Sequence, residues 1–233
     1  MTPHVDEDWS RALCVVAHPD DLEYGAASAV ARWTSQGKAV AYALVTSGEA
    51  GIDGMSPHEC RPVREDEERR SAAVVGVADV RFLGHSDGLV VADLALRRDI
   101  AAAIRWWRPD VVLTMSHELV WFGGNVNHAD HRAVGVAVLD ACRDAANRWL
   151  FADAGDPWQG VKAVYVVPAD PATHYVDVSA SIDTGVASLR EHRAYIDGLG
   201  SGFDPDAFLR GNAAGDGAEV GVDAAVLVRQ LRV

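Results

Sequence analysis

The chain has 233 residues, of which 49% are hydrophobic and 24% are charged, as in soluble globular proteins, and no stretch approaches the ~18 consecutive apolar residues of a membrane span. Its 34 acidic and 21 basic residues give a formal net charge of −13, which would repel phosphate backbones and anionic lipid, so we expect neither a nucleic-acid nor a membrane partner. Residues 1–8 are acidic and lack the basic and apolar segments of a secretory signal, so we expect a cytoplasmic location.

The length fits one large domain, and no Pro-rich or Ser-rich linker divides the chain. We therefore expect a single domain over residues 1–233. The three cysteines, Cys14, Cys60 and Cys142, are odd in number and widely spaced, which favours reduced structural thiols over a disulfide framework or a thiolate metal site. A homo-oligomer is compatible with the sequence, which does not define the oligomeric state.

Predicted strands and helices alternate along most of the chain. In order they are strand 13–17, helix 25–35, strand 40–45, helix 64–75, strand 80–83, helix 94–107, strand 111–115, helix 129–149 and strand 161–167. This alternation predicts an α/β fold, a Rossmann-like three-layer sandwich with a mostly parallel sheet. Such sheets bind ligands at the C-terminal ends of their strands, where we expect the active site.

The last third has a weaker pattern. Residues 183–196 have the spacing of a helix, whereas residues 197–221 are rich in Gly, Ala and Asp. We expect this second segment to be less regular, with mobile loops.

A first polar cluster directly follows the first predicted strand. His18-Pro19-Asp20-Asp21 places one imidazole and two carboxylates at the C-terminal end of residues 13–17. Taken alone, this segment is equally compatible with a solvated turn and a helix N-cap.

A second cluster, Asn127-His128-Ala129-Asp130-His131, follows the fourth predicted strand and opens a helical pattern. A His-x-x-His pair on a helix is by itself more often an ordinary pair of surface or core histidines. Both clusters stand at strand ends of one α/β pattern, and this joint occurrence favours a single metal site shared between them.

Catalytic zinc commonly takes three His or carboxylate ligands and leaves a fourth position for water. Three residues of the two clusters satisfy this set: His18, Asp21 and His131. Asp20 would then be free to take the proton of the attacking water as general base. His128 would donate to the developing oxyanion or to the leaving nitrogen, and Asp130 would hold the other ring nitrogen of His128.

Both clusters resemble the motifs of a known family. Ala17-His18-Pro19-Asp20-Asp21, with Glu23 and Gly25 after it, resembles the first motif of the PIG-L/LmbE-like zinc-dependent de-N-acetylases (GlcNAc-PI de-N-acetylase-like), and residues 127–131 resemble their second motif. Between them, the resemblance continues through residues 46–51, 64–67, 75–77, 82–84 and 87–88. It covers most of residues 11–135, and Glu191-His192-Arg193 resembles a later family element more faintly.

The resemblance implies the same three zinc ligands, with Asp20 as general base and His128 as the electrostatic or acid partner. It also implies that Arg64 and Asp87 contact a polar substrate. The alternative for these two is a surface or helix-capping salt bridge.

The chain departs from the family pattern beside the second motif. Ala129 replaces the usual proline, and residues 116–122 replace a shorter polar lead-in. Trp121 and Phe122 would form an apolar or sugar-stacking wall beside the zinc, unless they simply pack against the core. His117 with Glu118 is interpreted as a neutral surface pair.

We therefore expect a zinc-dependent hydrolase that removes an N-acyl group, foremost acetyl, from a small-molecule amino sugar or glycoconjugate. Another divalent metal would also suit these ligands. One alternative is an amidase acting on a non-sugar or thiol-conjugate amide. Another is a non-catalytic sugar-binding or metal-binding descendant of the fold, which would have no need of Asp20 and His128. A dinucleotide-dependent oxidoreductase is disfavoured because no Gly-x-Gly-x-x-Gly turn follows the first strand.

Overall fold

The computed structural model describes residues 2–121, 124–200 and 202–233. Its strands form one seven-stranded sheet in the order β3-β2-β1-β4-β5-β7-β6. The strands are β1 (Arg11–Val16), β2 (Ala39–Leu44), β3 (Asp79–Phe82), β4 (Val111–Met115), β5 (Ala163–Val167), β6 (His174–Asp177) and β7 (Ala225–Arg232). All pairings from β3 to β5 are parallel, and β7 pairs antiparallel with both β5 and β6. The mostly parallel sheet is confirmed.

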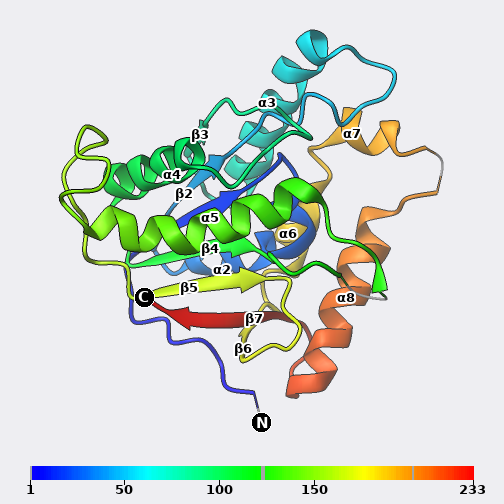
Figure 1. Ribbon diagram of the computed structural model, residues 1–233. Coiled ribbons are helices and arrows are strands. Elements are labelled where there is room, and N and C mark those ends of the chain that lie inside the picture. The colour runs from blue at the N-terminus through cyan, green and yellow to red at the C-terminus, as the bar shows by residue number, and fades with distance from the viewer. Residues whose placement is uncertain (1, 122–123, 201) are drawn as a thin grey trace.

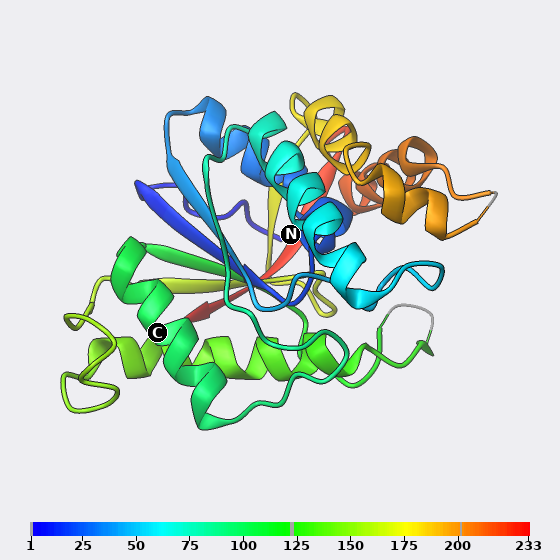
Figure 2. The same ribbon diagram turned by 90° about the horizontal axis from the view of Figure 1, so that it is seen from above.

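Helices cover both faces of the sheet and complete the expected three-layer sandwich (Figures 1 and 2). They are α1 (Asp21–Gly25), α2 (Ala27–Ser35), α3 (Pro57–Val74), α4 (Leu94–Trp107), α5 (Ala129–Ala146), α6 (Ile182–Leu189), α7 (Arg193–Gly198) and α8 (Pro205–Val220). α4 and α5 lie together on one face, and α2, α3 and α6 lie on the other (Figure 2). Of the helices described, none combines the length and the apolar character that a membrane span requires.

The local sequence explains how these layers join. β1 and β4 are apolar along almost their whole length because both of their faces are covered by helices. On α4, Leu96, Ile100 and Ile104 recur every four residues and are fully buried. Asp93 caps this helix by accepting a hydrogen bond from the Leu96 N–H at 2.9 Å.

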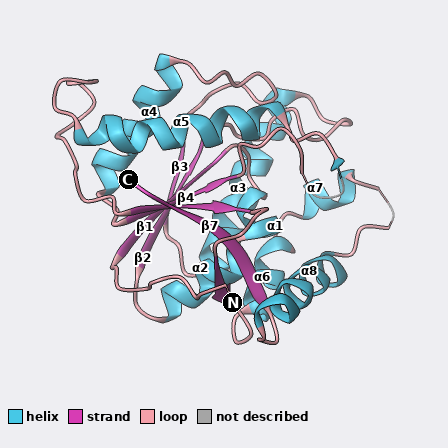
Figure 3. Cartoon of the chain, turned by 60° about the horizontal axis from the view of Figure 1, so that its bottom comes forward, coloured by secondary structure: helices cyan, strands magenta, loops and turns pink. Residues whose placement is uncertain are grey.

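The order of the sheet positions the functional clusters. β1 lies between β2 and β4, and the helices that follow β1 and β4 lie on opposite faces of the sheet (Figure 2). The loops after β1 and β4 therefore flank the position at which sheets of this kind bind ligands. The first of these loops carries the 18–21 cluster and the second leads to the 127–131 cluster. Figure 3 shows the strands fanning out between the helical layers, with α4 and α5 on the side opposite α2 and α6.

Some predicted helix bounds were wrong. The helix expected over 25–35 is α1 and α2, which are separated at Ala26 (φ −138°). The helix expected over 183–196 is α6 and α7, and the helix expected over 129–149 ends at Ala146. α3 begins seven residues before the predicted 64, at Pro57, because Ser56 and Glu59 form a capping box there.

The irregular segment expected over 197–221 was also wrong for most of its length, because residues 205–220 form α8. Asp204 caps the start of this helix, accepting from the Asp206 and Ala207 N–H groups at 3.0 and 3.3 Å. Gly221 ends it with a left-handed φ of 84°. α8 packs against α6 and β7, and these tertiary contacts support a helix whose many Gly residues disfavour it locally.

Candidate metal centre and active site

The turn after β1 brings His18 and Asp21 together. The backbone N–H of His18 donates to Asp21 Oδ2 at 2.7 Å. Between them Asp20 has a left-handed backbone conformation, with a φ of 91°, which lets α1 begin at Asp21. The side chains of His18 and Asp21 therefore lie next to each other.

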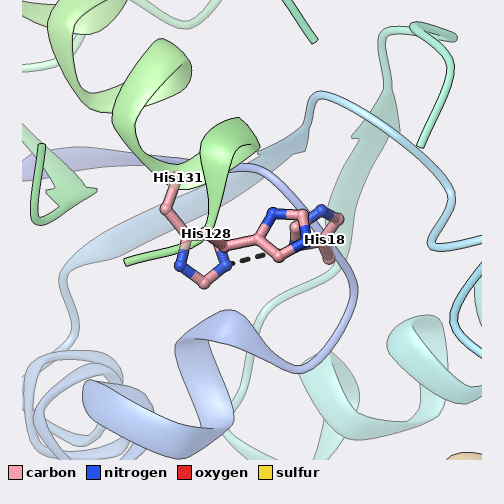
Figure 4. A group of neighbouring side chains, drawn as sticks. All are labelled: His18, His128 and His131. Carbon is pink, nitrogen blue, oxygen red and sulfur yellow. Dashed lines mark hydrogen bonds between the residues drawn. The ribbon is translucent and has the colours of Figure 1, made fainter. Parts of the chain in front are cut away.

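His131, on the first turn of α5, completes a triangle with these two side chains. His18 Nδ1 lies 3.3 Å from His131 Nε2 and 3.5 Å from Asp21 Oδ2, and His131 Nε2 lies 3.1 Å from Asp21 Oδ1. Figure 4 shows the imidazoles gathered with His128, with the contact between His18 and His131 dashed. Tetrahedral ligands held about 2.0–2.1 Å from a zinc ion are separated by roughly 3.3 Å. The donor atoms thus have the spacing of a zinc site.

The other nitrogen of each ring has its own partner. His18 Nε2 lies 3.1 Å from Asp87 Oδ1 and 3.3 Å from Asp130 Oδ2, and His131 Nδ1 lies 3.1 Å from Asn127 Oδ1. Because these oxygens can accept hydrogen bonds from the outer nitrogens, His18 Nδ1 and His131 Nε2 face inward and would offer their lone pairs to a metal ion that displaces the inner ring proton. The donor set therefore fits a divalent cation.

Charges around the triangle favour a cation as well. Burial lowers the pKa of His18, but Asp21, Asp130 and Asp87 together raise it to about 12. Burial raises the pKa of Asp21, yet His131 and His18 hold it far below its usual range. Such an excess of carboxylates in a buried position stabilises positive charge.

The carboxylates of Asp130 and Asp87 contact other groups than those expected from the sequence. The carboxylate of Asp130 contacts His18 rather than His128, and it accepts from the backbone N–H groups of Gly88 and Val90 at 2.7 and 3.2 Å. Asp87 Oδ2 accepts from the Ala50 N–H at 2.8 Å. We expected Asp87 to contact substrate, but the structure engages both of its oxygens with the protein and places it behind His18.

Arg64, also expected at the substrate, lies behind Asp20 instead. Only 1% of Arg64 is exposed, and its Nη2 donates to Asp20 Oδ2 at 3.0 Å and to the Pro19 carbonyl at 2.5 Å. The guanidinium carbon also stands 4.0 Å from the centre of the Tyr195 ring. Burial raises the pKa of Asp20, and Arg64 opposes that shift.

His128 stands at the open side of the triangle. It is the N-cap of α5, and its Nδ1 accepts from the Asp130 backbone N–H at 3.3 Å. Its exposed ring lies 5.1 Å from the His18 ring, edge to face. Burial, together with His18 and His131, lowers the pKa of His128. The ring is therefore neutral near pH 7, with Nε2–H free to donate.

Trp121 borders the same opening. Its ring centre lies 5.1 Å from that of His131, and 36% of the residue is exposed. Phe122, the other member of the expected wall, lies outside the described residues. Glu118 forms an ion pair with Arg229 at 2.8 Å, so it is not simply a partner of His117. The structure thus brings the predicted ligands, Asp20, His128 and Trp121 into one site.

Comparison with known proteins adds a family to this geometry. A family model described as PIG-L, GlcNAc-PI de-N-acetylase, matches residues 13–142, more than half of the chain. The chain belongs to the PIG-L family.

Relatives of this PIG-L protein include named deacetylases, which are hydrolases of C–N bonds. The diacetylchitobiose deacetylase of Thermococcus kodakarensis is 31% identical over 193 residues, which cover 80% of this chain and 70% of that protein. A probable N-acetyl-alpha-D-glucosaminyl L-malate deacetylase 2 of Bacillus anthracis is 30% identical over 138 residues, covering 56% of this chain and 58% of that protein. The solved N,N'-diacetylchitobiose deacetylase of Pyrococcus horikoshii, in complex with its inhibitor MPG, has the same fold. Its TM-score is 0.85 at 23% identity, over 97% of this chain and 85% of that one.

Sequence reasoning missed a buried polar cluster behind the site of this PIG-L protein. Glu23, Glu68 and His192 are at most 1% exposed, and their donor atoms lie within 4.8 Å of one another. Glu23 and His192 stand in segments that resemble the family, but neither was given a role. Glu68 stands in a run of acidic residues on α3, where nothing local distinguishes it from Asp66, which is exposed.

Proposed function

We propose that this chain is a zinc-dependent hydrolase that removes an N-acetyl group from an amino sugar or glycoconjugate. The observation that carries the proposal is the triangle of His18, Asp21 and His131, with a buried carboxylate, Asp20, beside it and a neutral imidazole, His128, at its opening. Two relatives support the substrate class, because one is named as a deacetylase of diacetylchitobiose and the other as a probable deacetylase of N-acetyl-alpha-D-glucosaminyl L-malate.

In this proposal zinc is held by His18 Nδ1, His131 Nε2 and the Asp21 carboxylate. A zinc ion bound there would lower the pKa of a coordinated water and polarise the amide carbonyl. The same ligands suit other divalent ions, so the identity of the metal is part of the proposal.

The remaining steps belong to the protein side chains. Asp20, which Arg64 holds through Oδ2, accepts the proton of the attacking water. His128 donates from Nε2 to the carbonyl oxygen as negative charge develops on it. The proton taken by Asp20 then passes to the departing amine, so that acetate and a free amino group leave the site.

Substrate recognition is assigned to the exposed border of the opening. The ring of Trp121 is inclined by 31° to the ring of His131. One face of the indole lies toward His131, and the opposite face would be available to stack on a sugar ring. Because Arg64 and Asp87 are occupied by Asp20 and His18, we assign them to holding those residues rather than to the sugar.

The proposal is tested by assaying free amine release from N,N'-diacetylchitobiose and from N-acetylglucosaminides with polar and apolar aglycones. Zinc-loaded protein is expected to release one amine and one acetate for each N-acetyl group hydrolysed, and Asp20→Asn serves as the inactive control. If only non-sugar or thiol-conjugate amides were hydrolysed, the amino-sugar substrate would be rejected and the protein would be an amidase of that other class. Zinc-loaded protein that binds these sugars without releasing amine would identify a binding protein.

A further inference from the structure

α3 contacts Asp20 at two points. Arg64 reaches its carboxylate, and Glu68, one helical turn later, reaches its backbone, with Glu68 Oε2 accepting from the Asp20 N–H at 3.2 Å. Arg64 and Glu68 are 1% and 0% exposed. The two contacts hold the side chain and the main chain of the same residue.

The backbone of Asp20 needs such support. Its φ of 91° lies in the left-handed region, which is costly for a residue with a Cβ. Asp20 stands at the N-cap of α1, but its side chain makes no capping hydrogen bond. Its conformation therefore depends on the partners of its N–H and carboxylate.

Glu68 is in turn enclosed by buried polar groups. His192 Nε2 lies 3.7 Å from Glu68 Oε2 and 3.6 Å from Glu23 Oε2. Glu23 Oε1 accepts from the Ser71 hydroxyl at 2.5 Å, and the Ser71 and Ser188 hydroxyls are 2.7 Å apart. This cluster joins α1, α3 and the end of α6, and it surrounds the Glu68 carboxyl.

We propose that Glu68, backed by His192, is a positioning residue that fixes the left-handed backbone of Asp20 and so aims its carboxylate at the reacting water. The catalytic consequence rests on the proposed function, whereas the effect on the Asp20 backbone does not. Glu68 acts through Asp20 and touches no substrate.

Two variants of similar size separate the hydrogen bond from packing. Glu68→Gln keeps an oxygen that can accept from the Asp20 N–H, and Glu68→Met fills the same space without an acceptor. Burial, and then the charge of Glu23, raise the pKa of Glu68 well above its usual range, so the neutral amide of Gln is a close substitute. Asp144→Asn is the control, because it alters a buried carboxylate on α5 that pairs with Arg97 and is remote from Asp20.

The first measurement is the hydrogen-exchange rate of the Asp20 amide by NMR, which requires no activity. We expect exchange at least about tenfold faster in Glu68→Met, and within about threefold of wild type in Glu68→Gln and Asp144→Asn, because only Met removes the acceptor of this N–H. Unchanged exchange in Glu68→Met, or equally fast exchange in Gln and Met, would overturn the proposal. If Met prevents folding, the smaller Glu68→Ala replaces it.

The second measurement separates kcat from KM on an N-acetylated amino sugar. Glu68→Met is expected to lower kcat at least about tenfold and to change KM less than about twofold, because the group misplaced is the base rather than a binding group. Glu68→Met should still bind one equivalent of metal. If the wild type bound two equivalents and Glu68→Met only one, the cluster of Glu23, Glu68 and His192 would be a cation site, and the proposal would be overturned. If the wild type were inactive but the variants showed the expected exchange rates, the hydrolase function would be rejected and the role of Glu68 in holding the Asp20 backbone would stand.

Discussion

Asp20 and Asp21 are adjacent carboxylates with different surroundings. Both oxygens of Asp21 face the ring nitrogens of His18 and His131, whereas Asp20 is directed toward Arg64. The left-handed turn at Asp20 separates the two side chains. In the proposed mechanism, a metal ligand and a base can therefore follow one another in the sequence without competing for the same ion.

Asp20→Asn should strongly reduce turnover and leave the metal bound. The amide cannot accept the proton of water, so kcat should fall at least about 100-fold, the usual scale of general-base catalysis, with metal content unchanged. Asp21→Asn is the matched control, which should lose metal. A near-normal rate for Asp20→Asn in a steady-state assay would remove Asp20 from the mechanism.

Trp121→Ala should weaken substrate binding. Its partly exposed ring borders the opening without bonding to Asp20 or His128, so KM should rise about fivefold to tenfold while kcat changes less than about threefold. Trp149, 83% exposed and beyond the far end of α5, provides the control Trp149→Ala. Equal kinetics for both variants would exclude the aromatic wall.

At this scale the sequence predicts residues that stand in short motifs. His18, Asp21 and His131, which the structure brings together, could be singled out because each motif carries several chemically active groups at a strand end. Glu68 was not, because its burial depends on how α3 packs against α1 and α6. The contacts of Arg64 with Asp20 and of Asp87 with His18 were also not predicted, since spacing along the chain does not show which protein groups a side chain meets.

Among the elements, α5 carries His131 toward the end of β4 through a close approach at Gly135. A Cβ at this position would lie 2.8 Å from the Met115 carbonyl oxygen and 2.9 Å from His117 Cβ. Gly135 thus allows the first turns of α5 to rest against β4.

Gly135→Ala should push α5 outward. We expect a loss of about 1–3 kcal/mol in the free energy of unfolding and weaker zinc binding, measured by denaturant titration and by competition with a chelator. Gly211 on α8 has no atom within 4 Å of its added Cβ, so Gly211→Ala should instead stabilise by about 0.5–1 kcal/mol. If both variants had a higher free energy of unfolding than the wild type, the close approach of α5 to β4 at Gly135 would be contradicted.

α8 and β7 meet at Asp216, whose Oδ2 accepts from the Leu227 N–H at 3.4 Å. Burial raises the pKa of Asp216 to about 6, against about 3.9 for an unfolded Asp. Ionisation is therefore harder in the folded state. Below about pH 4 the Asp216 carboxyl does not lower the free energy of unfolding. Its ionisation lowers that free energy progressively as the pH rises through 4–6, and the full destabilisation is present above pH 6.

Asp216→Asn should remove that cost. We expect the free energy of unfolding to rise by about 1 kcal/mol at pH 7.5, allowing for the partial exposure of this side chain. The increase should shrink toward zero at pH 4. Thermal unfolding of both proteins at the two pH values measures the difference. A gain independent of pH would contradict the assignment.

At the scale of the whole molecule, the strand order brings together residues more than one hundred positions apart. The parallel part, from β3 to β5, was predictable because apolar runs, interrupted at Arg81 in the short strand β3, alternate with helical spacing. β6 and β7 were missed because each pairs antiparallel after a long connection, and β7 carries Arg229, Gln230 and Arg232, which break the apolar pattern. The position of the site at the ends of β1 and β4 followed from the parallel part alone.

In the proposed site, two motifs more than one hundred residues apart form one metal centre. Measuring metal per chain by mass spectrometry, in the purified protein and in His131→Ala handled identically, tests this most directly. We predict about one equivalent of zinc in the wild type and little in the variant, because the variant retains only two of three ligands. Absence of bound metal from the wild type even after zinc addition, or equal metal in both proteins, would contradict the account.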